Sequence, residues 1–186
     1  MKAQLIILQG GEDVGKRTNE ILFKNVVNLS VTKNILVIPW TSKTLEKEME
    51  YRTIFNNYFT HSGFQDVLFL ETDDSNLEIT RKITSVDVIY LPGGAPDILY
   101  REIKKRSLQN RLYNFKGILI GNSAGAIVLS KGSVDPHEGK FFSGFGLVKF
   151  FITVHFNLHQ GSTTEKFEGP VINIPEDMWV ATSGQD

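Results

Sequence analysis

A serine surrounded by small residues lies between two apolar runs in the segment ILIGNSAGAIVLS, residues 118–130. Residues 121–125, Gly-Asn-Ser-Ala-Gly, fit the pattern G-x-S-x-G, which forms a sharp turn between a strand and a helix. The small neighbours let the backbone pack closely, and the serine hydroxyl is exposed at the carboxyl edge of the sheet. We therefore predict that Ser123 is a nucleophile on a nucleophile elbow. The alternative is a tight turn in which Ser123 only caps the following helix.

A nucleophilic serine needs a base, because its hydroxyl is inert at its own pKa. The chain has four histidines, and these are the candidates. His61 ends a predicted helix, where a cation suits the helix dipole, and His137 lies in a loop that contains glycine and proline. His155 lies late in a strand predicted over residues 150–156, between apolar neighbours. We expect His155 to be the base, with His159 as the alternative.

A third group must orient the imidazole, and the spacing of the residues leaves this group open. Two candidates, Asp135 and Glu138, belong to a loop predicted over residues 131–146. Two others, Glu176 and Asp177, lie close to the end of the chain. Each of these carboxylates, taken alone, is more typical of an ordinary solvated surface group.

A pair of glycines could bring backbone N–H groups close to a ligand. Gly93 and Gly94 close the strand predicted over residues 86–94, and glycine permits such a close approach. Loops of this kind cluster at the carboxyl edge of an open α/β sheet, beside the predicted elbow. We assign an oxyanion hole to the backbone at Gly94 and Ala124. The alternative for the glycines is a simple turn before the next helix.

Alternating strands and helices have to position these residues. Strands that are apolar throughout are covered on both faces, and the intervening helices supply the cover. The pattern predicts one α/β domain over residues 1–186, a flavodoxin-like three-layer sandwich with a mostly parallel sheet and helices on both faces. The predicted strands are residues 4–9, 34–40, 65–71, 86–94, 116–121, 150–156, 169–174 and 178–182. The predicted helices are 17–29, with Ile21, Leu22, Val26 and Leu29 inward, 43–61, one begun by a capping box of Ser75 and Glu78, and 97–105.

Composition argues against several classes of function. The 20 Lys and Arg nearly balance the 21 Asp and Glu, whereas binding to nucleic acid or to a membrane surface needs a field of one sign. There is no cysteine for a disulfide or a thiolate zinc site. No stretch approaches the roughly 20 apolar residues of a membrane span, and the start lacks a secretory cleavage pattern. We expect a soluble, cytoplasmic protein that acts without nucleic acid or membrane, with a homodimer left open.

Taken together, these stretches resemble the cyanophycinase/dipeptidase E family of serine peptidases, within the class I glutamine amidotransferase-like superfamily. The resemblance rests on IILQGGED, VIYLPGG, GNSAGAIVLS, SGFGLV, VHF and VINIPEDMWVAT, and it extends over almost the whole chain. It implies that Ser123 is the nucleophile and His155 the base, with no cofactor or metal. Cyanophycinase-like members favour Glu176 as the acid of the triad, and dipeptidase E-like members favour Asp135.

The resemblance further implies a serine-type peptidase that hydrolyses small peptides next to aspartyl residues. Two features of this chain depart from the family pattern. The stretch after the family's His-Phe is often rich in arginine, but residues 157–167 contain none. Pro175 replaces an aspartate of the family. These departures leave open a member without catalytic activity, which would use the same pocket to bind a ligand or a partner.

Two other motifs suggest weaker alternatives. Residues 10–18, GGEDVGKRT, match most of a P-loop, but Arg17 stands where Ser or Thr must hold Mg²⁺, and Glu12 and Asp13 would repel phosphates. Nucleotide binding is therefore the weaker hypothesis. His155 and His159 have the spacing of a helical metal pair, but the glutamate of the H-E-x-x-H motif is missing. On a strand two such side chains lie too far apart for easy chelation, so we predict no metal.

Overall fold

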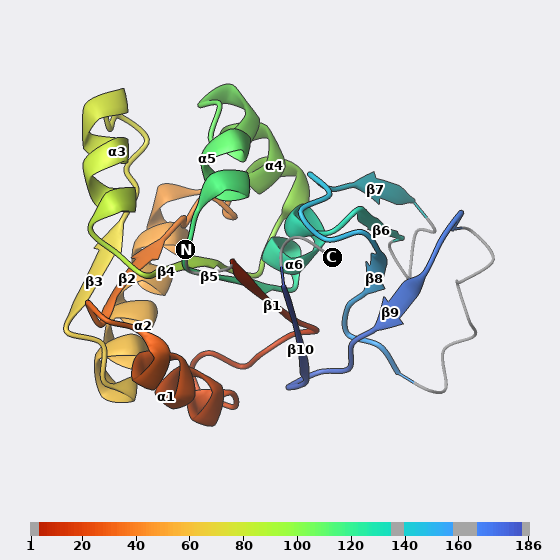
Figure 1. The fold of residues 1–186 in the computed structure, drawn as a ribbon, viewed down its shortest axis with the longest axis horizontal. Helices are drawn as coiled ribbons and strands as arrows, with labels where there is room; N and C mark the ends of the chain where they lie inside the picture. The colour runs from red at the N-terminus through yellow and green to blue at the C-terminus, as the bar shows by residue number, and fades with distance from the viewer. Residues whose placement is uncertain (1–3, 135–139, 158–166, 184–186) are drawn as a thin grey trace.

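A six-stranded sheet forms the centre of the computed structural model, which describes residues 4–134, 140–157 and 167–183 (Figure 1). The strand order is β10-β1-β5-β4-β2-β3, and only the edge strand β10 runs antiparallel to its neighbour in this sheet. This arrangement confirms the predicted, mostly parallel sheet. The strands are β1 (Leu5–Gln9), β2 (Asn34–Val37), β3 (Asp66–Phe69), β4 (Val88–Leu91), β5 (Ile118–Asn122) and β10 (Trp179–Ser183).

Helices cover both faces of the sheet, as predicted for a three-layer sandwich. Helices α1 (Glu20–Leu29) and α2 (Leu45–Ser62) pack on one face. The helices of the other face are α3 (Asn76–Thr84), α4 (Pro96–Lys105), α5 (Gln109–Asn114) and α6 (Ala124–Leu129). Figure 1 shows the two helical layers on opposite sides of the strands.

The four inner strands, β1, β2, β4 and β5, are buried on both faces, which explains their continuous apolar sequences. In β1, Ile6 and Leu8 face one layer of helices, whereas Ile7 faces the other. Successive side chains of a strand point to opposite faces, so a strand between two layers needs an apolar residue at every position. Burying each such side chain contributes about 1.5–3 kcal/mol to folding.

Helix α1 differs from its prediction in its start and in its buried face. The helix begins at Glu20, and Ile21 and Leu29, which were expected to face inward, are 77% and 61% exposed. Phe23 instead contacts Tyr58 of α2, with ring centroids 5.0 Å apart. This aromatic contact sets the rotation of the helix, and the spacing of apolar residues alone does not indicate it. The buried residues are Leu22, Phe23, Val26 and Val27.

The capping box predicted from the sequence is present at the start of α3. The Ser75 hydroxyl accepts a hydrogen bond from the N–H of Glu78, and the Glu78 carboxylate accepts one from the N–H of Ser75. This reciprocal pair is the predicted capping box, and it begins α3 at Asn76. Such local contacts can be predicted because both partners lie within one turn of the chain.

The region after Ser130 contains more strands than the sequence indicated, and shorter ones. The segment predicted as a loop over residues 131–146 includes β6 (Gly132–Val134) and β7 (Phe141–Ser143), which pair antiparallel. The strand predicted over residues 150–156 ends at Thr153. This strand is β8 (Phe151–Thr153), which pairs in parallel with β9 (Val171–Asn173) beside the main sheet (Figure 1).

No helix among the described residues combines the length and the apolar character that crossing a bilayer requires.

Candidate active site

Ser123 occupies a strained turn between β5 and α6. Its backbone has φ 45° and ψ −101°, a region that residues other than glycine rarely adopt. Two flanking glycines allow this geometry. A Cβ on Gly121 would lie 2.5 Å from the carbonyl carbon of Gly125, and a Cβ on Gly125 would lie 2.0 Å from the carbonyl oxygen of Leu91. The glycines of the G-x-S-x-G pattern are therefore required by packing, and the half-buried serine lies between them.

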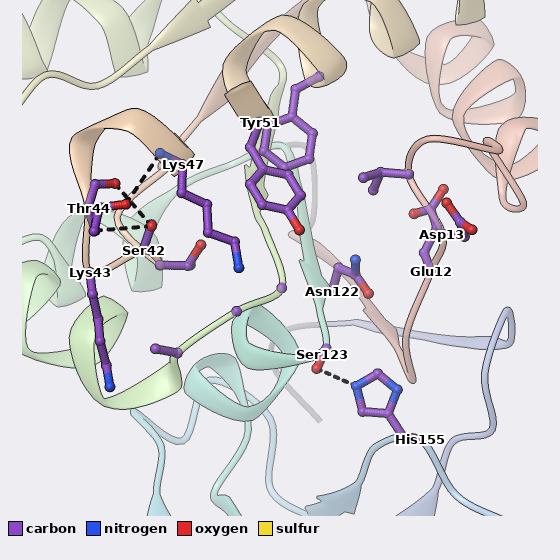
Figure 2. Close-up of a pocket in the computed structure, with 16 residues that line it drawn as sticks. Glu12, Asp13, Ser42, Lys43, Thr44, Lys47, Tyr51, Asn122, Ser123 and His155 are labelled. Atoms are coloured by element: carbon purple, nitrogen blue, oxygen red, sulfur yellow. Dashed lines mark hydrogen bonds between the residues drawn. The ribbon is translucent and has the colours of Figure 1, made fainter. Parts of the chain in front are cut away.

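Three side chains from distant parts of the chain form a continuous chain of hydrogen bonds. The Ser123 Oγ lies 2.8 Å from Nε2 of His155 (Figure 2). The opposite ring nitrogen, Nδ1, contacts Oε2 of Glu176. The side chains of His155 and Glu176 are 50% and 53% exposed, so the pair can be reached by substrate and water. This order of hydroxyl, imidazole and carboxylate can activate an alcohol for attack on a carbonyl.

The carboxyl end of β1 binds the backbone of the three chain segments that carry Ser123, His155 and Glu176. The carbonyl oxygens of residues 9, 10 and 11 accept, in this order, hydrogen bonds from the backbone N–H groups of Ser123 (3.1 Å), His155 (2.8 Å) and Asp177 (3.0 Å). Asp177 directly follows Glu176, so the third bond anchors the segment that carries the carboxylate. Three consecutive carbonyls thus set the relative positions of the hydroxyl, the imidazole and the carboxylate.

Two glycines at this strand end make the close approach possible. A Cβ on Gly11 would lie 2.3 Å from Oε2 of Glu176 and 2.4 Å from Cε1 of His155. A Cβ on Gly10 would lie 2.1 Å from the carbonyl oxygen of Pro175. In the sequence, this glycine pair after a buried strand indicated only a turn at the carboxyl edge of the sheet that could line the peptidase pocket. Its contact with the imidazole and the carboxylate is not visible in the sequence.

The structure corrects the expected surroundings of His155. The residue does not belong to a strand between apolar neighbours, but follows the end of β8 with φ 51°. Its side chain is exposed, so the imidazole does not pay for burial in an apolar environment. Its backbone N–H bonds to Gly10, and this bond replaces the strand pairing that was predicted.

The candidate carboxylates are separated by the structure. Glu176 contacts the imidazole, whereas the Asp177 carboxylate accepts a hydrogen bond from the Thr18 hydroxyl. His61 lies at the end of α2. Its Nε2 is 3.4 Å from Oε1 of Glu20, so its partner is this carboxylate and not the serine. The remaining candidates lie outside the described residues: Asp135, His137, Glu138 and His159.

The loop assigned to an oxyanion hole lies next to the serine. Gly94 has φ 129°, which favours glycine, and a Cβ there would lie 2.8 Å from the carbonyl oxygen of Thr41. On the serine's own helix, the Gly125 N–H donates to the Pro92 carbonyl, at 3.2 Å. The preceding N–H, that of Ala124, is the first of α6 and has no acceptor within that helix. The role of Gly94 and Ala124 in an oxyanion hole stays a prediction.

A cavity of about 690 Å³ opens in front of Ser123 and His155 (Figure 2). This volume is typical of sites for small molecules. Its walls come from the turn after β1, the loop before α2, the first turns of α2, and the loop after β4. Besides the serine and the histidine, the lining residues are Glu12, Asp13, Val14, Thr41, Ser42, Lys43, Thr44, Lys47, Tyr51, Phe55, Gly93, Gly94, Ala95 and Asn122.

Glu12 lies in the turn after β1, and its carboxylate is held from several sides. It accepts hydrogen bonds from the Tyr58 hydroxyl, from Nε2 of Gln9 (3.0 Å) and from the N–H of Asn19 (3.3 Å). Burial raises the pKa of Glu12, although these hydrogen bonds favour the charged form and oppose the shift. Burial and the neighbouring Glu12 carboxylate also raise the pKa of Tyr58 far above its usual range.

The P-loop hypothesis gains no support from this turn. Helix α1 begins at Glu20, so its N-terminus does not directly follow the glycines. Lys16, which would contact phosphates, pairs with Asp13 at 2.9 Å. The Glu12 carboxylate occupies the inside of the turn, where an anion would be repelled. Within the described residues, no three side chains of the metal-binding types gather around a common point.

Comparisons with known proteins agree on one family and one fold. The sequence profile of peptidase family S51 matches residues 5–186. No curated relative matches the sequence. A peptidase from an acI-B1 Actinobacterium has a TM-score of 0.72 at 19% identity, and the match covers 97% of this chain and 84% of that one. A candidate peptidase E of Listeria monocytogenes EGD-e has a TM-score of 0.71 at 22% identity, covering 99% and 96%. At these identities the structural likeness shows the fold.

Proposed function

Because the chain belongs to peptidase family S51, the family of dipeptidase E and cyanophycinase, and is thus a serine peptidase, we propose that it hydrolyses small peptides through Ser123, His155 and Glu176. The observation that carries the proposal is the unbroken chain of hydrogen bonds from the serine hydroxyl through the imidazole to the carboxylate. The three residues meet through backbone contacts with one strand end, which supports a common role.

The reaction proceeds through an acyl-enzyme. The Ser123 Oγ attacks the peptide carbonyl carbon, and Nε2 of His155 takes the hydroxyl proton. Glu176 accepts the hydrogen bond from Nδ1 and stabilises the imidazolium that forms. When the C–N bond breaks, the imidazolium gives the proton to the leaving amine. Water then enters, loses a proton to the same imidazole and attacks the acyl carbon. When the ester bond to Oγ breaks, the imidazolium returns the proton to Ser123 and the acid is released.

The oxyanion of each tetrahedral intermediate would be stabilised by the backbone N–H groups of Gly94 and Ala124. Donors fixed in place before the reaction cost no reorganisation when the charge develops, and one donor typically contributes a factor on the order of 10²–10³ in rate. The strained turn at Ser123 likewise holds a reacting group in place before the reaction, since it keeps the hydroxyl at the cavity and not in the sheet.

The substrate that we propose is a short peptide cut next to an aspartyl residue. The size of the cavity suits a ligand of a few residues, since sites for small ligands span about 300–1,000 Å³. The aspartyl preference comes from the family resemblance.

Covalent labelling tests the proposed nucleophile. A fluorophosphonate probe should label the protein, and Ser123→Ala should lose both the label and peptide hydrolysis. His155→Ala should lose most of the label, because the hydroxyl is then no longer activated. Ser143→Ala, which removes an exposed hydroxyl from β7, is the matched control and should behave like the wild type. Folded protein that neither takes the label nor hydrolyses any peptide would instead indicate a binding protein.

A further inference from the structure

One wall of the cavity carries two lysines. Lys43 and Lys47 both line the cavity that contains Ser123 and His155. In Figure 2 the two lysines lie on one side of Ser123, and His155 lies on the other. The Lys47 ammonium lies 5.9 Å from the centre of the Tyr51 ring, which is itself part of the wall. The cavity therefore presents positive charge on the side away from the imidazole.

The charge of these lysines is not neutralised within residues 4–134, 140–157 and 167–183. In that part of the chain neither ammonium forms an ion pair with a carboxylate. The two acids that line the cavity have other partners. Asp13 pairs with Lys16, at 2.9 Å, and the Glu12 carboxylate is held by Tyr58 and its neighbours. The lysine wall is thus free to bind an anionic group of a ligand.

The loop that carries Lys43 leads directly into α2, which carries Lys47, and this loop is fixed against the loop that follows β4. The Ala95 N–H donates to the Thr41 carbonyl at 3.0 Å, and Gly94 approaches Thr41 so closely that a Cβ would collide with it. The neighbouring hydroxyls already serve the backbone, because Ser42 donates to the Thr44 carbonyl, and Thr44 caps α2. The ammonium groups of Lys43 and Lys47 therefore remain as the cationic donors of this wall.

The lysines and His155 lie on opposite sides of Ser123, and this arrangement indicates which part of a bound peptide the lysines would contact. His155 must give a proton to the leaving amine, so the part of the substrate after the cut bond lies on the imidazole side. The acyl part, which precedes the cut bond, then extends toward the opposite wall. This part of a peptide has no C-terminal carboxylate. An anionic group on it must belong to a side chain.

From this placement we propose that Lys43 and Lys47 determine specificity, by binding the side-chain carboxylate of the residue that precedes the cut bond. The inference rests on the proposed function, and it names the residues of this chain that would recognise the substrate. Within the described residues the two lysines have no carboxylate partner, so the substrate carboxylate would be their counter-ion. An uncharged isostere of the substrate would leave both lysines unpaired. Discrimination between aspartate and asparagine is therefore the direct readout.

The test compares the peptides Asp-Leu and Asn-Leu, which differ in one charge. The wild type should have a higher kcat/KM for Asp-Leu. In the double variant Lys43→Gln with Lys47→Gln, the ratio of kcat/KM for Asp-Leu to that for Asn-Leu should fall by about 10-fold to 100-fold, as expected for the loss of charge-assisted hydrogen bonds. Fluorophosphonate labelling of Ser123 should be unchanged. Lys105→Gln removes the same charge from an exposed site on α4 and should leave the ratio unchanged.

The amidated peptide Asp-Leu-NH₂ identifies the carboxylate. If the lysines bind the side chain, the double variant should impair hydrolysis of the amide as strongly as that of the free acid. An effect confined to the free acid would mean that they bind the C-terminal carboxylate, and would overturn the proposal.

The remaining outcomes separate the inference from the proposed function. Hydrolysis that depends on Ser123, with an Asp-to-Asn ratio that the double variant leaves unchanged, overturns the lysine assignment alone. No hydrolysis of any of these peptides, or hydrolysis that Ser123→Ala does not abolish, overturns the proposed function and the inference with it.

Discussion

The two halves of the candidate triad are built in different ways. Ser123 follows β5, which lies between β1 and β4 in the centre of the sheet, and its backbone is strained. His155 and Glu176 follow β8 and β9, a pair of short strands outside that sheet, and both side chains are half exposed. The serine is positioned by its own turn and by the core around it. The histidine and the glutamate depend on contacts with another segment of the chain.

That other segment is the end of β1, where residues 9–11 join the two halves. One carbonyl accepts from the serine, and the next two accept from the histidine segment and from the glutamate segment. The comparison shows that Ser123 is positioned by the core of the main sheet, whereas His155 and Glu176 lie outside it. A short, glycine-containing turn contacts the segments of these two residues, and the space at Gly11 admits nothing larger than hydrogen.

The largest loss of kcat/KM is expected from removing the charge of Glu176, which belongs to the half of the candidate triad outside the main sheet. Glu176→Gln keeps the size of the side chain but loses the carboxylate that contacts Nδ1 of His155. We expect kcat/KM to fall by a factor on the order of 10³–10⁴, as for other triads that lose their acid, with little change in the free energy of unfolding.

Two controls accompany this variant. Asp177→Asn should lower kcat/KM less than tenfold, because that carboxylate contacts Thr18 and not the imidazole. Asp135→Asn should behave in the same way if Glu176 is the acid. A larger loss in either control than in Glu176→Gln would assign the acid to that residue and would break the proposed contrast between the halves.

The next largest effect on kcat/KM is expected at the end of β1, where residues 9–11 join the two halves. Gly11→Ala would place a methyl group 2.3 Å from the Glu176 carboxylate and 2.4 Å from the His155 ring, so the pair must move away. A displacement of about 1 Å typically costs about 10²-fold in rate, and we expect kcat/KM to fall by about this factor. Gly15→Ala is the matched control, since its nearest neighbour is the Asp13 carboxylate at 3.3 Å. Equal activity of the two variants would show that the turn after β1 does not position the pair.

The smallest effect is on stability and concerns the carboxylate inside the same turn. Burial raises the pKa of Glu12 in the folded protein above its value of 4.5 in the unfolded chain. The stability that its neutral form contributes is fully present below the unfolded pKa, and it is lost as pH rises through the folded pKa. Glu12→Gln does not titrate there. The wild type should therefore lose stability relative to the variant as the pH rises from 4.5 through the raised pKa of Glu12.

Urea unfolding at several pH values measures this difference. The free energy of unfolding of the wild type minus that of Glu12→Gln should decrease steadily as pH rises. A difference that is constant, or that grows with pH, would mean that the hydrogen bonds from Tyr58 and Gln9 outweigh burial at this carboxylate.

Much of the architecture was predictable because its signals are local. Apolar strands alternating with helical segments indicate a parallel sheet between two layers, and the structure confirms this. The tight turn at Ser123 also has a local signal, since G-x-S-x-G places the glycines and the serine within five consecutive residues. The strained φ of Ser123 is consistent with that motif.

The surroundings of the other site residues were not readable. His155 was expected inside a strand, and it lies beyond one with φ 51°. Glu176 and Asp177 are adjacent in sequence, and only their contacts show that one faces the imidazole and the other faces Thr18. The importance of Gly11 also depends on which residues approach it from far along the chain.

The sequence by itself therefore determined the layers, the turn at Ser123 and the short set of residue types able to work with it. The tertiary structure alone decided which imidazole lies beside the hydroxyl, which carboxylate lies beside that imidazole, and which lysines face the cavity. Local signals depend on backbone sterics and on the burial of apolar side chains within one element. The meeting of residues 9–11 with the segments at 123, 155 and 176 depends on chain closure over more than a hundred residues, and no local pattern encodes that distance.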